Sequence, residues 1–276
     1  MESSTATSLR ELPPGGVWIA ERKLWFGGVR LRSRMTVLRL ADGRIWVHSA
    51  SEPTPELCAE LDRLGQVSWI VVPNRYHHLQ ASAMKARYPN AQVIGPASAR
   101  SRNKAVVLDV AIDDERLPSL VPELSPVALR GVPFLDETLF FHAKTQTLIG
   151  ADLMLCGCAA DHWTWRWASR VSGQYQRHKA PPDVRWHTRG GPHVRQSLEE
   201  IAKLPLKRIL VAHSDPVEDH PVEQLEEAWR FVRIYFPIGG CSAASSWGPR
   251  HAGGTTQKQD QHLRSASDFR CRLSPG

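Results

Sequence analysis

The sequence has 276 residues, of which 42% are hydrophobic and 23% are charged, and its formal net charge is +7. This composition is typical of one or two globular domains, and no apolar run approaches the roughly 18 residues of a membrane-spanning helix. Residues 237–276 carry five basic and two acidic residues, so +3 of the charge belongs to this end and +4 to the rest. Because no basic stripe is interleaved with aromatic residues, we expect no nucleic-acid partner, and we expect no membrane partner either.

The two ends of the chain bound a single predicted domain over residues 13–236. Residues 1–12 are polar and lack the apolar stretch of a secretory signal, so we predict a disordered N-terminus there. Residues 237–276 are rich in Gly, Ser, Gln and Arg and lack apolar periodicity, which predicts a disordered tail. The five cysteines are an odd number, which favours reduced thiols and a cytoplasmic location.

The first part of the domain has the pattern of short strands followed by a helix. The predicted strands are Val17–Ala20, Leu24–Leu31, Met35–Leu40 and Arg44–Ser49. Thr54 and Pro55 then form a helix start, with Thr as the N-cap and Pro at the first helical position. We expect this helix to end at Gly65.

A buried strand over 67–72 then runs into a pair of histidines. Its apolar, β-branched residues are bounded by Pro73 and Asn74, and a helical pattern follows from Leu79 to Tyr88. His77 and His78 therefore lie on the turn between a strand end and a helix start, where ligands bind in open α/β sheets. Neutral imidazole is the commonest metal ligand among side chains, although such a pair can also simply pack or cap.

The second half places two more polar groups at strand ends. We predict strands over 92–95, 127–132, 137–142 and 146–152, the last ending at Asp152, and a strand over 207–212 that runs into His213. Amphipathic helices are predicted over 194–204 and 222–236. Residues 161–192 are rich in tryptophan and are predicted to form a hairpin or lid, either as a solvent-shielding loop or as a wall of a substrate pocket.

Three stretches carry a resemblance to a known family. They are Thr147-Leu-Ile-Gly-Ala-Asp152, Ile209-Leu-Val-Ala-His213 and the strand–turn–helix that contains His78. Together they resemble the metallo-β-lactamase superfamily over residues 13–236, and in particular a poorly characterised, motif-degenerate branch of it. The resemblance implies an α/β (α+β) fold, a four-layer αββα sandwich, and metal-dependent hydrolysis.

The sequence departs from the family's metal-binding motif, His-x-His-x-Asp-His. That motif falls on Pro73, Arg75, His77 and His78, so both leading histidines are missing and His77 stands in place of the aspartate. The loop over 130–134 also lacks the family's histidine. By the same resemblance, Asp152 falls on the family's metal-bridging aspartate and His213 on its last histidine.

These losses remove the ligands of one of the family's two metal sites and leave the ligands of the other site in place, with one replacement. The resemblance therefore predicts one site, made of His77, His78, Asp152 and His213, for a single divalent transition metal. Zinc suits this set, and iron or manganese are the alternatives. Asp152 is also the predicted catalytic residue, as a base that orients a metal-activated water. Arg75 is either a surface residue or a substrate-binding cation for a carboxylate or phosphate.

Two functions follow from this site. The first is a single-metal hydrolase that acts on a small-molecule ester, lactone, amide or phosphoester. The alternative is a non-catalytic protein that keeps the fold as a binding or structural module, because four protein ligands could close the metal site to water.

Overall fold

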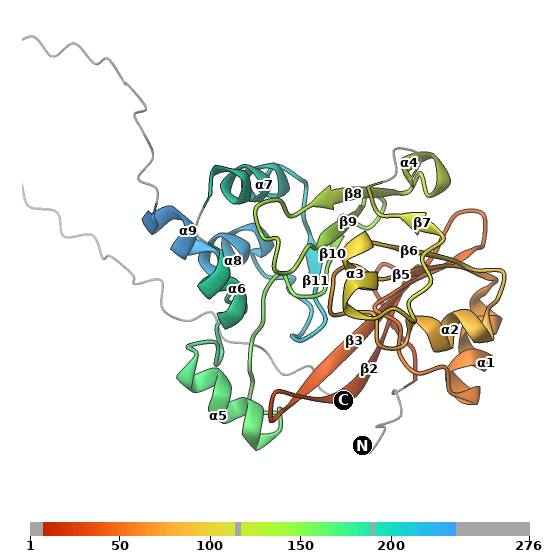
Figure 1. The fold of residues 1–276 in the computed structure, drawn as a ribbon, viewed down its shortest axis with the longest axis horizontal. Helices are drawn as coiled ribbons and strands as arrows, with labels where there is room; N and C mark the ends of the chain where they lie inside the picture. The colour runs from red at the N-terminus through yellow and green to blue at the C-terminus, as the bar shows by residue number, and fades with distance from the viewer. Residues whose placement is uncertain (1–7, 114–116, 189–190, 236–276) are drawn as a thin grey trace, which may run out of the picture.

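The computed structural model describes residues 8–113, 117–188 and 191–235 and contains two β-sheets (Figure 1). The larger sheet has the strand order β1-β2-β3-β4-β5-β6-β7. Its strands are β1 (Arg10–Leu12), β2 (Val17–Phe26), β3 (Val29–Arg39), β4 (Ile45–His48), β5 (Val67–Val71), β6 (Gln92–Gly95) and β7 (Val110–Ala111). The chain is antiparallel from β1 to β4 and parallel from β4 to β7.

The N-terminal part of this sheet differs from the sequence-based expectation in two ways. Arg10–Leu12 pair with β2, so ordered structure begins inside the stretch predicted to be disordered. The three strands expected between residues 17 and 40 are one long hairpin, β2–β3, which turns at Gly27 and Gly28. Both glycines have positive φ, at 54° and 80°, a conformation that glycine adopts without steric cost.

Three helices cover the outer face of the larger sheet: α1 (Pro55–Leu64), α2 (Ala81–Arg87) and α3 (Ala97–Arg102). Thr54 caps α1 as predicted, because its Oγ1 accepts a hydrogen bond from the Leu57 amide. The apolar face of α1 packs with Met84 of α2, Ala99 of α3 and the strands in one buried cluster.

The smaller sheet has the order β11-β10-β9-β8. Its strands are β8 (Leu124–Ala128), β9 (Thr138–His142), β10 (Thr147–Ile149) and β11 (Arg208–Leu210), with β10 and β11 parallel. The helices of this half are α4 (Leu117–Leu120), α5 (Trp163–Val171), α6 (Pro182–His187), α7 (Pro192–Ala202), α8 (Pro221–Ala228) and α9 (Arg230–Tyr235). The helix expected over 222–236 is thus broken in two at Trp229, and the tryptophan-rich segment is helical rather than a hairpin. The predicted tail, 237–276, lies outside the described residues.

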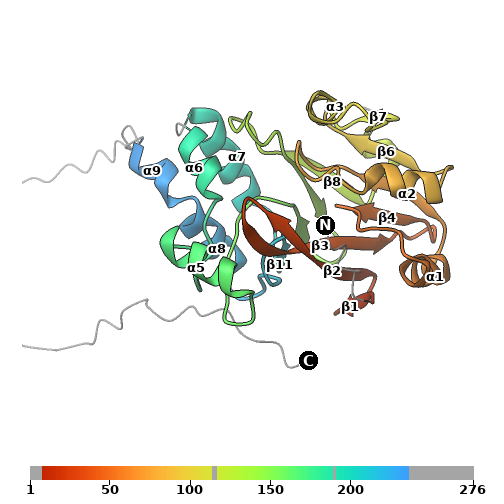
Figure 2. The same cartoon turned by 60° about the horizontal axis from the view of Figure 1, so that its bottom comes forward.

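The two sheets pack face to face around a separate apolar core that includes Trp46, Phe140 and Leu210. A third core, including Val194 and Trp229, joins the smaller sheet to its helices. In Figure 2 the helices α1–α3 and α5–α9 lie on opposite sides of the two sheets. The predicted αββα sandwich is confirmed. Among the helices of the described residues, none has the length and apolarity to cross a membrane.

His48 makes this core sensitive to acid. Its ring is 1% exposed and stacks on Trp46, and its Nε2 has no hydrogen-bond partner. Burial, helped by His77, lowers the pKa of His48 from 6.5 to about 3. Because folding keeps the ring neutral, its contribution to stability is complete above pH 6.5 and is lost as the pH falls from 6.5 toward 3.

We therefore predict that His48→Phe flattens the acid side of the pH–stability profile. Between about pH 7.5 and pH 5.5, the parent should lose roughly 1 kcal/mol more unfolding free energy than the variant. Urea denaturation at the two pH values measures this difference, and His220→Gln, at an exposed histidine, is the control. Equal losses in parent and His48→Phe would contradict the prediction.

Candidate metal centre

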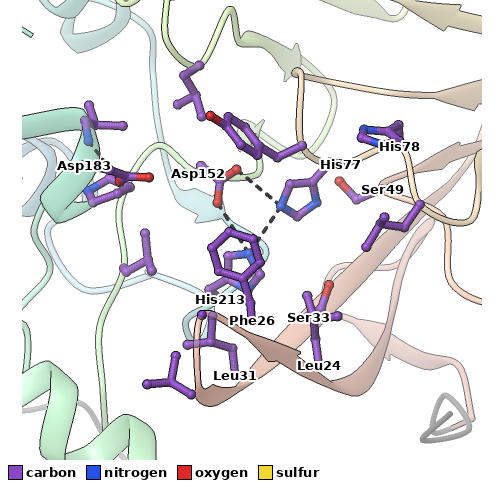
Figure 3. A pocket seen from close by; sticks show the side chains of 18 of the residues that line it. Leu24, Phe26, Leu31, Ser33, Ser49, His77, His78, Asp152, Asp183 and His213 are labelled. Carbon is purple, nitrogen blue, oxygen red and sulfur yellow. Dashed lines mark hydrogen bonds and ion pairs between the residues drawn. The ribbon is translucent and has the colours of Figure 1, made fainter. Parts of the chain in front are cut away.

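Three side chains converge at the ends of three strands. His77 follows β5, Asp152 follows β10 and His213 follows β11. The Nε2 atoms of His77 and His213 are 3.2 Å apart, and they lie 3.3 and 3.4 Å from the two carboxylate oxygens of Asp152 (Figure 3). All three side chains therefore come from segments that follow the carboxyl ends of strands, β5 in the larger sheet and β10 and β11 in the smaller one.

Asn74 shapes the turn that presents His77. Its side chain is completely buried, and its Oδ1 accepts hydrogen bonds from the backbone amides of Tyr76 (2.9 Å) and His77 (3.0 Å). An asparagine that binds the amides two and three residues ahead folds the chain into a tight turn. The same side chain donates from Nδ2 to Asp152 Oδ2 at 2.8 Å. Asn74 thus fixes two of the three converging groups.

Glu137 supports Asp152 from behind. Its buried carboxylate accepts hydrogen bonds from the amides of Ala151 (2.6 Å) and Asp152 (3.1 Å). Burial and the nearby charge of Asp152 raise the pKa of Glu137 to about 8. Burial acts in the same direction on Asp152, but His77 and His213 outweigh it and lower the pKa of Asp152 well below its usual range. Of the two neighbouring carboxyl groups, Asp152 is therefore the one that the site favours as an anion.

His213 is held in one tautomer by the backbone. Its Nδ1 lies 2.6 Å from the carbonyl oxygen of Arg32, which can only accept a hydrogen bond. Nδ1 therefore carries the proton, and the lone pair of Nε2 faces His77 and Asp152. Arg32 in turn forms ion pairs with Asp161 at 2.8 Å and Asp215 at 2.6 Å, which anchor the strand that holds the histidine.

The donor chemistry of the three groups fits a divalent transition metal. The ligand atoms of His77, Asp152 and His213 all lie within 4.8 Å of one another, and the residues are half-buried or buried. Two imidazole nitrogens and one carboxylate oxygen are ligands that zinc, iron and manganese accept. The backbone bond on the far nitrogen of His213 is the usual outer-shell support of a metal-binding histidine.

The other two predicted site residues lie outside this group. His78 is buried, and its Nδ1 lies 2.9 Å from the carbonyl oxygen of Arg75. Figure 3 shows its ring turned away from the three converging side chains. Arg75 does not line the pocket described below; it donates from Nη1 to the carbonyl oxygen of Pro133 at 3.4 Å. The turn built by Asn74 therefore points adjacent side chains in different directions.

A cavity of about 850 Å³ opens above the three converging groups. Its walls are mainly apolar and include Leu24, Phe26, Leu31, Leu155 and Trp165. The polar residues Arg22, Arg102 and Asp183 also line the cavity, and none of them was among the site residues predicted from the sequence. The tryptophan-rich segment forms one wall, through Trp165 and residues 181–184, which agrees with the pocket-wall interpretation.

Known proteins resemble this chain in fold rather than in sequence. Residues 14–99 match the family described as "Domain of unknown function (DUF4336)", a match that includes His77 but ends before Asp152 and His213. No curated protein matches the chain in sequence. A metallo-beta-lactamase from Pontibacter korlensis superposes with a TM-score of 0.56 at 14% identity, over 83% of this chain and 99% of its own. The chain has the metallo-β-lactamase fold.

Two further solved structures superpose on the chain to a similar degree. A Pseudomonas aeruginosa metallo-beta-lactamase in a mono-zinc form has a TM-score of 0.54 at 12% identity, over 86% of this chain and 99% of its own. A fragment of a Nostoc diflavin flavoprotein has a TM-score of 0.59 at 11% identity, over 85% and 98%. The superpositions establish the fold. At such low sequence identities they do not establish an activity, which has to be inferred from the residues of this chain.

The two adjacent histidines of this metallo-β-lactamase-fold protein have different positions: His77 belongs to the converging group, and His78 does not. We predict that His77→Ala lowers the affinity for zinc by about 100-fold or more, because it removes one of three converging ligands. His78→Ala should change that affinity by less than about tenfold, the range of a group that only supports a ligand. Competition with a fluorescent zinc chelator measures both variants. Equal losses in the two variants would show that His78 also binds the metal.

Proposed function

We propose that this protein is a hydrolase that uses one divalent metal ion held by His77, Asp152 and His213. The observation that carries the proposal is the convergence of these three ligand atoms at the floor of an apolar cavity. Three protein ligands leave a fourth position for water, which distinguishes catalytic zinc sites from structural ones. That His78 lies outside the group favours this open arrangement over a closed set of four.

The residues around the site have separable roles in such a reaction. When bound, a divalent metal would supply Lewis acidity and a water of lowered pKa. Asn74 holds Asp152 through a 2.8 Å hydrogen bond, and the Arg32 carbonyl holds His213 through a 2.6 Å bond. These contacts fix the direction of both side chains before substrate binds, which lowers the cost of organising the site. Asp152, anionic and facing the cavity, is placed to ligate the metal or to orient the attacking water.

The cavity supports a small substrate with an apolar body. Leucine, phenylalanine and tryptophan side chains form most of its walls, and such walls exclude water from the reacting group. Arg22 and Arg102 are the cations that line the cavity, in the role first assigned to Arg75. We propose an ester, lactone, amide or phosphoester as the reacting group, and zinc, iron or manganese as the metal.

Metal removal and return tests the proposal. Protein treated with a chelator should lose hydrolysis of a panel of nitrophenyl esters, lactones, amides and phosphodiesters, and one added metal ion per chain should restore it. Asp152→Asn should stay inactive after metal is returned. Binding of one metal ion without hydrolysis of any panel member would favour the alternative, a non-catalytic module with the same fold.

A further inference from the structure

One end of the molecule exposes large apolar side chains that a folded protein normally buries. Five of them form what we call the aromatic rim, and each is between 55% and 71% exposed. They are Trp25, Phe26, Trp163, Trp167 and Val171. Single exposed apolar residues are common on proteins, but a group of them marks an interaction site.

The rim is continuous across two elements. The ring of His162 lies 5.6 Å from the ring of Trp25 and 5.8 Å from the ring of Trp163, so it links the β2–β3 hairpin to α5. Thr164 Oγ1 also accepts a hydrogen bond from the Arg30 amide at 3.0 Å. Figure 1 shows the end of the hairpin beside α5. The hairpin tip and α5 therefore lie side by side, with His162 between Trp25 and Trp163.

Cations accompany the aromatic residues on α5. Trp163, Trp167 and Val171 are four residues apart and share one face of the helix, whereas Trp165 on the opposite face is buried. Arg166 and Arg170 are exposed and, by the same periodicity, lie beside that face. Both guanidinium groups donate to backbone carbonyls, and that of Arg170 also lies 3.6 Å from the centre of the Tyr175 ring.

The rim borders the mouth of the cavity. Alternate residues of β2 face opposite sides of the hairpin, and Arg22, Leu24 and Phe26 line the cavity. Phe26 is therefore both an exposed rim residue and part of the cavity wall. Trp25 and the exposed Lys23 lie on the other side of the same strand.

We propose, against the sequence-based expectation of no membrane partner, that the aromatic rim docks this protein on an anionic lipid surface. Tryptophan is the side chain most typical of the membrane–water interface, and arginine and lysine beside it attract anionic headgroups. A hairpin tip and a short helix that present both together fit such a surface without spanning it. A single-stranded nucleic acid would instead need a continuous cationic groove along its backbone, and the rim has apolar residues at its centre.

Docking there would turn the cavity mouth toward the membrane. In combination with the proposed hydrolase function, on which this step rests, the substrates would be esters or amides with an aliphatic chain that enters beside Phe26. Lipid binding itself needs neither the metal nor the reaction, so the two proposals can fail separately.

Vesicle flotation with the full chain, after metal removal, tests the docking. Vesicles of phosphatidylcholine with about 30% phosphatidylglycerol should bind at least tenfold more protein than phosphatidylcholine alone, because basic residues near an anionic surface strengthen binding. Trp163→Ser/Trp167→Ser should reduce binding about tenfold or more, and Arg166→Gln/Arg170→Gln should remove the preference for the anionic lipid. Val107→Ser and Lys203→Gln/Lys207→Gln, at exposed positions outside the rim, are the matched controls.

Three results would overturn the proposal. One is equal binding by the parent and the double tryptophan variant, with circular dichroism showing both folded. Another is a shift from dimer to monomer in the same variant, which would assign the rim to a second copy of the chain. The third is rim-dependent binding of a labelled single-stranded oligonucleotide with no binding of vesicles.

Discussion

Asp152→Ala should reduce the affinity for zinc by about 100-fold or more and abolish metal-dependent hydrolysis. Asp152 is the member of the site that contacts both histidines, at 3.3 and 3.4 Å. Its carboxylate is the anionic ligand of the set, and the two imidazoles alone cannot neutralise a divalent ion or complete its coordination. Isothermal titration of the metal-free variant with zinc measures the loss.

Two companion variants separate this effect from general damage. Asp152→Asn keeps the size of the side chain and removes its charge, so it should lose metal affinity while keeping the fold. Asp62→Asn removes an exposed acid on α1 that pairs with Arg87 and should leave metal binding unchanged. Wild-type affinity in both Asp152 variants would place the metal elsewhere.

Asn74→Ala should reduce metal affinity by about 10- to 100-fold, although Asn74 is not a proposed ligand. Loss of the Nδ2 donor frees the Asp152 carboxylate, and loss of the Oδ1 acceptor releases the turn that holds His77. Outer-shell groups of this kind typically contribute that much to metal binding. The variant should also lose about 1–3 kcal/mol of unfolding free energy, because the two part-buried amides of Tyr76 and His77 lose their acceptor.

Asn103→Ala is the matched control for Asn74→Ala. Asn103 also accepts a hydrogen bond from the amide two residues ahead, but in an exposed turn after α3. Its removal should leave zinc affinity at the parent value. If Asn74→Ala binds zinc within about threefold of the parent, Asn74 does not organise the site, and the positioning role is wrong.

Position along the chain explains which site residues could be predicted. His77, Asp152 and His213 each follow an apolar strand. β10 and β11 are parallel neighbours in the smaller sheet, so their ends meet at one edge, and the turn after β5 of the larger sheet reaches the same place from across the sandwich. The sandwich itself followed from the order of strands and helices and from the three family-like motifs. Sequence could not decide between His77 and His78, because their directions depend on a turn whose geometry is set by Asn74.

The missed residues act through contacts between distant parts of the chain. Glu137 reaches the amides of Ala151 and Asp152 from the start of a different strand, and its sequence context gives no signal of this. Asn74 did have a local signal, an asparagine directly after a buried strand, which is typical of a turn that binds its own backbone. Its bond to Asp152, 78 residues away, is visible only in the folded chain.

The tryptophan-rich segment shows how spacing can mislead. Trp163, Trp165 and Trp167 alternate with other residues, which imitates the two-residue period of a strand. In the structure they lie on α5, where Trp165 packs against Leu31 and Leu155 while the other two are exposed. Exposed tryptophans break the usual correspondence between apolar pattern and burial, and such breaks are expected where a surface has a function.

Crystallography of zinc-soaked protein with anomalous scattering is the most direct test of the metal centre. A single three-ligand site predicts one anomalous peak per chain, about 2.0–2.2 Å from the Nε2 atoms of His77 and His213 and from a carboxylate oxygen of Asp152. A peak bound by His78 in place of His77, a second peak beside it, or no peak among these three residues would contradict a single three-ligand metal site.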